Sequence, residues 1–98
     1  MNLKDAIKLK NNCENKLEQT TDKLLKETAI PLAEQEIKEA IRNHKNHVML
    51  DLNDNVTAYE PEQKKIAIKL TEYLKQQQFN AIIHTDKYGA FYVKVSGW

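Results

Sequence analysis

The side chains best suited to chemistry lie between residues 51 and 62. Oxygen-bearing residues recur there at the spacing of a calcium-binding helix–loop–helix loop: Asp51, Asn53, Asn55, Thr57, Tyr59 and Glu62. The sixth position of such a loop needs glycine for its sharp turn, and this chain has Val56 there. Pro61 also falls inside the loop, which follows an apparent strand rather than a helix. We therefore expect a solvated strand-to-helix loop instead of a calcium site.

Histidine and cysteine offer no better basis for a site. His44 and His47 are two ligands, whereas zinc needs three or four that converge. Cys13 is the single cysteine, and the neighbouring Glu14 would raise its pKa rather than activate the thiol. We interpret Cys13 as a helix-face residue, and one cysteine gives no sign of an oxidising compartment.

A metal-dependent nuclease would need acids clustered beside a lysine on adjacent strands. Asp51, Asp54 and Lys94 offer the residue types, but no second acid accompanies Lys94. The two glycines cannot supply a phosphate-binding loop. We therefore expect a protein that is not an enzyme, with no catalytic residue, metal or cofactor.

The last part of the chain carries aromatic and cationic side chains instead. Tyr88, Tyr92 and Lys94 could stack and hold single-stranded nucleic acid, or simply pack on their neighbours in a hairpin. Trp98 either tucks against the body or is presented to a partner, and we favour tucking. These four residues, with Leu17 and Leu24 of the first helix, are our candidate partner-binding residues.

The elements that position these residues begin with a helix over residues 3 to about 27. Its apolar residues form a thin stripe at helical spacing: Leu3, Ile7, Leu17, Leu24 and Leu25. The second core position of a heptad frame is poor, so a strict coiled coil is not expected. We expect this helix to pack on the body of the protein or on a second copy.

Pro31 interrupts the helical region, either as a kink in one long helix or in the first turn of a second helix. The segment 31–41 is strongly helical, and Ala33, Ile37, Ala40 and Ile41 share one apolar face. We expect this second segment to belong to the core.

The C-terminal half predicts a βαββ unit. Strands are expected at 47–52, 79–84 and 91–96, with a helix from about Pro61 to Gln78 and a hairpin loop over 85–90. A strand–helix–strand crossover should be parallel, and the last strand should add antiparallel to the second, so we expect a three-stranded mixed sheet. One sheet face then stays exposed, with Tyr92 and Lys94 on it.

Composition fits one α+β domain over residues 1–98, with 1–30 protruding and 31–98 forming the core. The chain has 98 residues, 41% of them hydrophobic, and a net charge of +1. Near-neutrality argues against strong nonspecific binding of nucleic acid. Because no apolar run reaches membrane-spanning length and the first residues are polar, we expect a cytoplasmic protein without membrane contact.

The segments Tyr73–Phe79 and Phe91–Trp98 resemble those of small bacteriophage accessory proteins, in which a helix ends before a glycine–aromatic pair and a hairpin closes on tryptophan. Gln78 stands here where that glycine would be. The resemblance covers the C-terminal half and implies a phage or prophage protein acting in the host cytoplasm. It transfers no functional residues.

These features together favour a binding protein that acts by protein–protein contact, with inhibition of a host defence or transcription protein as the specific hypothesis. A homodimer through the N-terminal helix is expected alongside it. Two alternatives remain: a single-stranded nucleic-acid-binding module that uses the C-terminal hairpin, and a small virion or assembly protein that uses the helix to oligomerise.

Overall fold

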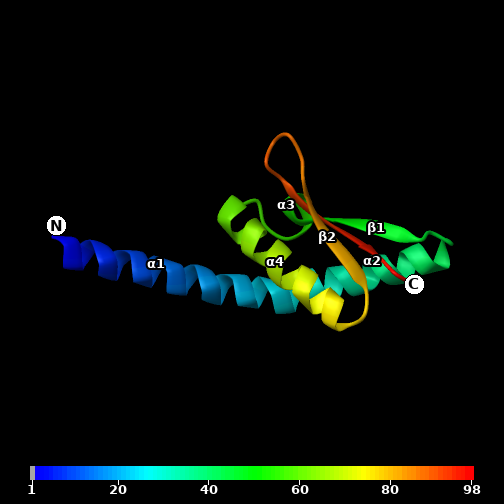
Figure 1. The fold of residues 1–98 in the computed structure, drawn as a ribbon, viewed down its shortest axis with the longest axis horizontal. Coiled ribbons are helices and arrows are strands. Elements are labelled where there is room, and N and C mark those ends of the chain that lie inside the picture. The colour runs from blue at the N-terminus through cyan, green and yellow to red at the C-terminus, as the bar shows by residue number, and fades with distance from the viewer. Residues whose placement is uncertain (1) are drawn as a thin grey trace.

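Asn2 starts the first helix by capping it. Its side-chain oxygen accepts a hydrogen bond of 2.9 Å from the backbone N–H of Asp5, and Asp5 also places a negative charge in the first turn. In the computed structural model, which describes residues 2–98, helix α1 (Leu3–Leu24), the π-helix η1 (Leu25–Ala29) and helix α2 (Ile30–Arg42) follow one another as a continuous helical run (Figure 1).

The π-helix explains how the run passes Pro31. The N–H of Ile30 bonds to the carbonyl of Leu25, five residues back, and Pro31, which has no N–H, lies in the first turn of α2. Wide turns of this kind occur as insertions within α-helices, and here the wide turn directly precedes the residue that lacks a backbone donor. The helix therefore continues through Pro31 as one run that contains a wide turn.

The remaining elements follow the predicted order. They are strand β1 (His47–Asp51), the short helix α3 (Leu52–Asn55), helix α4 (Glu60–Gln76), strand β2 (Asn80–Thr85) and strand β3 (Phe91–Ser96). The α+β class is confirmed, and β3 has the predicted limits. The short helix α3 was not predicted, because Asn53, Asp54 and Asn55 indicated a turn.

The sheet differs from the prediction in its pairing. Its order is β1-β3-β2, and β3 is antiparallel to both neighbours. The expected mixed sheet is therefore wrong. β1 and β2 do share a direction, as the crossover predicts, but β3 lies between them and takes the hydrogen bonds of both. A short hairpin can join β2 to β3 only if the two strands are antiparallel, and an antiparallel sheet can leave one face exposed to solvent.

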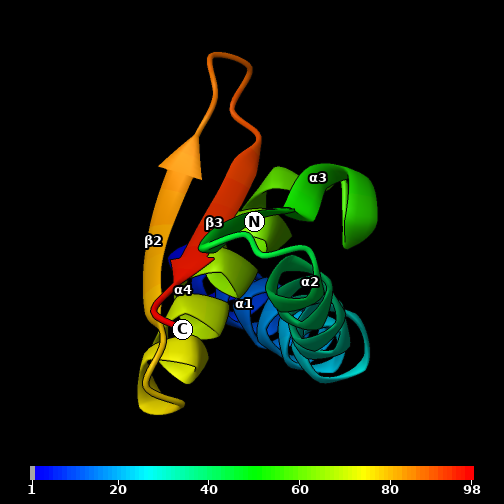
Figure 2. The same cartoon turned by 90° about the vertical axis from the view of Figure 1, so that its right-hand side faces the viewer.

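The core lies on one side of this sheet. Figure 2 shows the helices gathered on that side, with the other face of the strands left open. Buried side chains from the strands meet buried residues of α2 and α4; the core includes Ala33, Ile37, Leu50, Leu52, Ile66, Ala67, Leu70, Leu74, Ala81, Val93 and Val95. This packing confirms that the helical segment after Pro31 belongs to the core.

Buried Gln63 ties the start of α4 to both neighbouring elements. Its amide nitrogen donates to Asn53 at 2.9 Å, and its oxygen accepts from the backbone N–H of Phe91 at 3.2 Å. A buried amide with both ends satisfied fixes α3 and β3 relative to α4.

The protruding part of the chain is shorter than the predicted 1–30. Thr21 and Ala29 are fully buried, and Leu24 and Leu25 pack against the core. Residues 2–16 are all exposed. The molecule measures 59 × 28 × 18 Å, and the run α1–η1–α2 lies along the long dimension (Figure 1). We call residues 3–16 the α1 arm.

Gln78 sits in a left-handed backbone conformation where α4 ends. Its φ is +71°, and the N–H of Phe79 bonds back to the carbonyl of Leu74 at 3.0 Å, which closes the helix end. Glycine adopts this conformation without the strain of a Cβ atom, so Gln78→Gly should raise the free energy of unfolding by about 1 kcal/mol. Denaturant titration checks this. Gln77→Gly, at a residue with φ of −83°, is the control and should lower that free energy instead.

Candidate functional site

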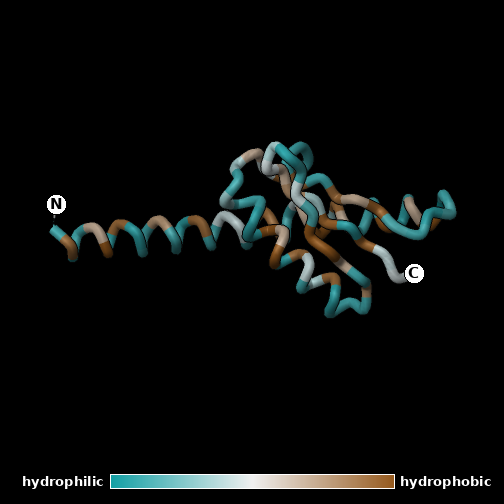
Figure 3. The backbone as a smooth tube through the Cα atoms, turned by 45° about the horizontal axis from the view of Figure 1, so that its top comes forward, coloured by the Kyte–Doolittle hydropathy of each residue, from teal (hydrophilic) through white to brown (hydrophobic). Residues whose placement is uncertain are grey.

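The α1 arm is amphipathic although it projects away from the body. Its apolar side chains fall on one half of the helix circumference, and Leu3, Ile7 and Leu9 are 76%, 50% and 51% exposed. Ala6 and Cys13 lie on the same half. Figure 3 shows apolar positions recurring along the whole projecting helix. The opposite half is polar throughout: Lys4, Asp5, Lys8, Asn11, Asn12, Asn15 and Lys16. We call the first half the apolar face of the arm.

A groove opens where the arm meets the body. Its volume is about 420 Å³, and it lies between α1 and the start of α4. Tyr59 and Glu62 line it from one side, and α1 lines it from the other with Lys10, Cys13, Glu14, Lys16, Leu17 and Thr20. We call it the arm-root groove. The groove continues the apolar face of the arm, because Leu17 and Cys13 belong to both.

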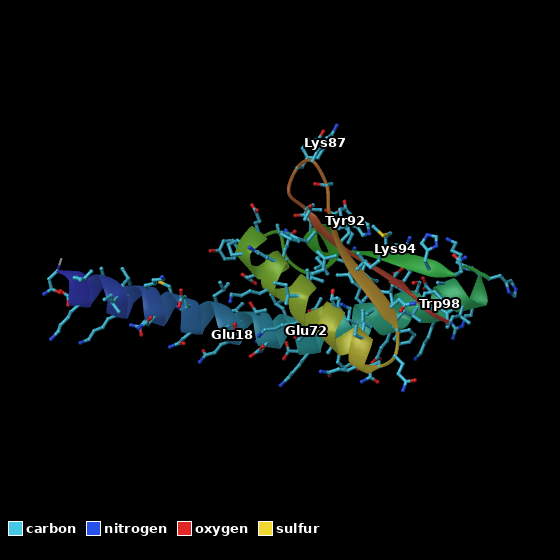
Figure 4. The ribbon with its side chains drawn as sticks, viewed as in Figure 1. Glu18, Glu72, Lys87, Tyr92, Lys94 and Trp98 are labelled. Atoms are coloured by element: carbon cyan, nitrogen blue, oxygen red, sulfur yellow. The ribbon has the colours of Figure 1, made fainter. Side chains whose placement is uncertain are left out.

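Ion pairs fasten the inner part of α1 to α4. Lys69 of α4 bonds to Glu18 and, at 2.6 Å, to Asp22, while Lys65 lies 3.4 Å from Glu18. Figure 4 shows Glu18 on α1, just before the point at which α4 crosses that helix. The hydrogen bond from Lys69 holds the pKa of Glu18 and of Asp22 below their ordinary values of 4.5 and 3.8, and the pKa of Lys69 is raised above 10.5 by the same bonds.

Those pKa shifts predict how the anchorage depends on pH. A carboxylate whose pKa is lowered by folding stabilises the protein above its pKa in the unfolded chain, and this stabilisation is lost as the pH falls through its pKa in the folded protein. A lysine whose pKa is raised by folding contributes stability that is lost above pH 10.5. Lys69→Met should therefore destabilise the protein between about pH 5 and 10, and the difference from wild type should shrink below pH 4. Chemical unfolding across the pH range measures this. A difference that stays constant down to pH 2 would contradict it.

The open face of the sheet is a second exposed surface. The register places Met49, Lys94 and Ile82 in one row across the three strands, and Asp51, Tyr92 and His84 in the next. Met49 and Ile82 are 43% and 58% exposed. Tyr92 and Lys94 lie on this face, as their alternation with Val93 and Val95 predicted, and Figure 4 shows both along the strand.

Carboxylates surround Tyr92 at the hairpin end of that face. The charge of Asp51 raises the pKa of the phenol above 10.0, and burial, Asp86 and Asp54 raise it further. The hydroxyl of Tyr92 donates to Asp86 at 3.4 Å. Phosphate groups would meet negative charge at this position, which disfavours nucleic acid at Tyr92.

Asp51 and Asp86 also have structural roles. Asp51 caps α3 by accepting hydrogen bonds from the backbone N–H groups of Asn53 and Asp54 at 3.0 and 3.2 Å. Asp86 accepts from the N–H groups of Tyr88 and Ala90 at 2.8 and 3.0 Å and so shapes the hairpin loop. Of the residues with calcium-like spacing, Asp51 thus caps the short helix α3, and Asn53 and Asn55 lie within it.

The histidine and cysteine side chains considered as metal ligands or as a nucleophile lie apart from one another on the surface. His44 ends α2 with a φ of +59°, and His47 makes a 2.8 Å contact with its neighbour Asn46. Cys13 is exposed on the α1 arm. Within residues 2–98, no three His, Cys, Asp or Glu side chains are placed to hold a metal ion. Over the same residues, no helix is both long and apolar enough to cross a membrane.

Trp98 is tucked against the body, as favoured. Its indole N–H donates to the carbonyl of Lys45 at 2.8 Å, and its ring meets Phe79 edge-on at 6.3 Å between centroids. Trp98 therefore clamps the C-terminus onto the loop after α2, and 37% of the residue stays exposed.

The six candidate partner-binding residues do not form one site. Leu17 lies in the arm-root groove, whereas Leu24 packs against the core. Tyr92 and Lys94 share the open sheet face. Tyr88, at the hairpin tip, is 83% exposed and lies under the ammonium of Lys87 at 5.1 Å. Trp98 is apart from all of them.

Sequence reasoning missed three contributors to these surfaces. Tyr59 completes the arm-root groove and was considered only as part of a loop. Met49 and Ile82 flank Lys94 on the open face, and their alternation with buried Leu50 and Ala81 was the available signal. The pairing order, which brings them beside Lys94, could not be obtained from that alternation.

Comparison with known proteins adds no relative to this geometry: no family model matches the chain, and neither a curated protein nor a solved structure is significantly similar to it.

Proposed function

We propose that this protein acts by protein–protein contact and that the α1 arm is the surface that makes it. One observation carries the proposal: residues 2–16 are exposed throughout, yet the arm keeps its apolar residues on one face. A helix of about four turns is marginally stable alone in water, and its stability in proteins comes from packing an amphipathic face. The apolar face of the arm therefore suits a protein partner.

The test compares two charge substitutions on the arm. Ile7→Glu places a carboxylate on the apolar face, and Lys8→Glu places the same carboxylate on the polar face. Both residues are exposed, so the fold should be kept, which circular dichroism checks. We expect Ile7→Glu to abolish association with protein partners, including other copies of the chain, and Lys8→Glu to retain it.

Affinity capture with quantitative mass spectrometry and solution mass measurements provide the two readouts. Equal association by wild type and Ile7→Glu in both would exclude the arm as the contact surface. Loss with both variants alike would indicate a general charge effect rather than contact through the apolar face.

The open sheet face is available for a further partner. Met49 and Ile82 offer apolar area beside Lys94, and Tyr88 stands at the hairpin tip. The resemblance to phage accessory proteins supports a host defence or transcription protein in the host cytoplasm as that partner. An assembly role would use the arm in the same way. We favour protein over nucleic acid here, because carboxylates surround Tyr92.

A further inference from the structure

We propose that the partner of the α1 arm is the arm of a second copy of this chain, packed antiparallel about a two-fold axis near Lys10. This inference rests on the proposed function and names the partner of the same surface. It follows from the continuity of the apolar face with the arm-root groove, from the position at which the body closes that face, and from the charges along its flanks.

The body of the protein sets the register. A second helix lying on the apolar face can extend along α1 as far as Leu17 and Thr20, which line the arm-root groove. It cannot pass Thr21, which is fully buried by its own chain. The tip of the second arm therefore stops with its Leu3 beside Leu17. Antiparallel helices in that register place Lys10 opposite Lys10 of the second copy.

This register fills two grooves at once. Leu3 of each copy enters the arm-root groove of the other beside Leu17 and Tyr59, and Ile7 lies beside Cys13. The contact is isologous, because the same surface serves on both copies and the assembly closes as a dimer. Glu62 on the groove wall then faces the N-terminal end of the incoming helix, where a carboxylate interacts favourably with the helix dipole.

Charges at the edge of the apolar face are complementary in this register. Glu14 of one copy comes within about one helical turn of Lys10 of the other. The central pair is unfavourable, since two Lys10 ammonium groups approach at the axis. Each has Glu14 of its own chain 4.0 Å away, which moderates the repulsion. We therefore expect a dimer that dissociates on dilution.

Directed disulfide formation in the full-length protein tests the arrangement. In a Cys13→Ser background, Lys10→Cys brings two thiols together at the axis and should oxidise to a covalent dimer. Leu3→Cys in the same background is the matched control. Its two thiols would lie about 21 Å apart along the helices, far beyond the separation of about 7 Å that a disulfide tolerates, so it should form no covalent dimer.

Sedimentation equilibrium of the wild-type chain accompanies the crosslinking. The mass should rise from 11.4 kDa towards twice that value with concentration, and Ile7→Glu should remain at 11.4 kDa. Crosslinking of both cysteine variants would mean parallel arms and would overturn the proposal.

A wild-type mass of 11.4 kDa at every concentration, without crosslinking, would also overturn the proposal. Arm-dependent capture of another protein would then leave the proposed function standing. Flotation with phosphatidylglycerol vesicles that depends on Ile7, by a chain that stays monomeric, would replace the second copy with a lipid surface.

Discussion

Replacement of Leu70 by alanine is expected to lower the free energy of unfolding by about 2–5 kcal/mol. Leu70 lies on α4 with no exposed surface and belongs to the core cluster that α4 forms with the sheet. Alanine removes its apolar contacts and leaves a cavity that the neighbouring side chains cannot fill. Small domains are stable by only about 5–15 kcal/mol in total, so this loss would leave a marginal fold.

Denaturant unfolding at one protein concentration measures the effect. Ile68→Ala is the matched control, because Ile68 lies on the same helix but is 44% exposed. It should cost much less than Leu70→Ala. Equal losses for the two variants would mean that α4 does not bury the face described above.

Replacement of Lys10 by leucine is expected to tighten self-association about 10- to 100-fold. The substitution removes two like charges from the proposed axis and adds two apolar side chains to a face that is otherwise interrupted there. Apolar burial of one leucine contributes about 1.5–3 kcal/mol when complete, and a leucine at a two-helix contact is partly buried. The predicted range follows from that fraction.

Sedimentation equilibrium of Lys10→Leu against wild type gives the two dissociation constants. Lys8→Leu adds the same side chain to the polar face and should leave the constant unchanged. An equal gain from both substitutions would indicate nonspecific apolar association. No gain from Lys10→Leu would place Lys10 outside the contact.

Much of the fold was predictable because its periodicities are local. Alternation around Val93 and Val95 predicted β3 at its observed limits and placed Tyr92 and Lys94 on the open face. The pairing order was not predictable, because insertion of β3 between β1 and β2 depends on how the whole sheet covers α4. The two outcomes left open at Pro31 could not be decided either, since a π-turn leaves no clear sequence signal.

The candidate surfaces, like the fold, could be predicted only in part from the sequence. The thin stripe from Leu3 to Leu17 indicated an incompletely buried helix, and the exposed arm agrees with that. The arm-root groove could not be predicted, because Tyr59 reaches it only through the tertiary packing of α4 beside α1. The buried bridge made by Gln63 was equally hidden, since a glutamine on a helix is usually exposed.

Hydrogen exchange of the backbone amides in residues 3–16 is the most direct measurement of whether the arm is a contact surface. Alone in water, a helix of about four turns opens readily and exchanges fast. Packing against a second copy predicts protection that rises with protein concentration and disappears in Ile7→Glu. Protection that is independent of both concentration and Ile7 would contradict the assignment of the arm as the contact surface.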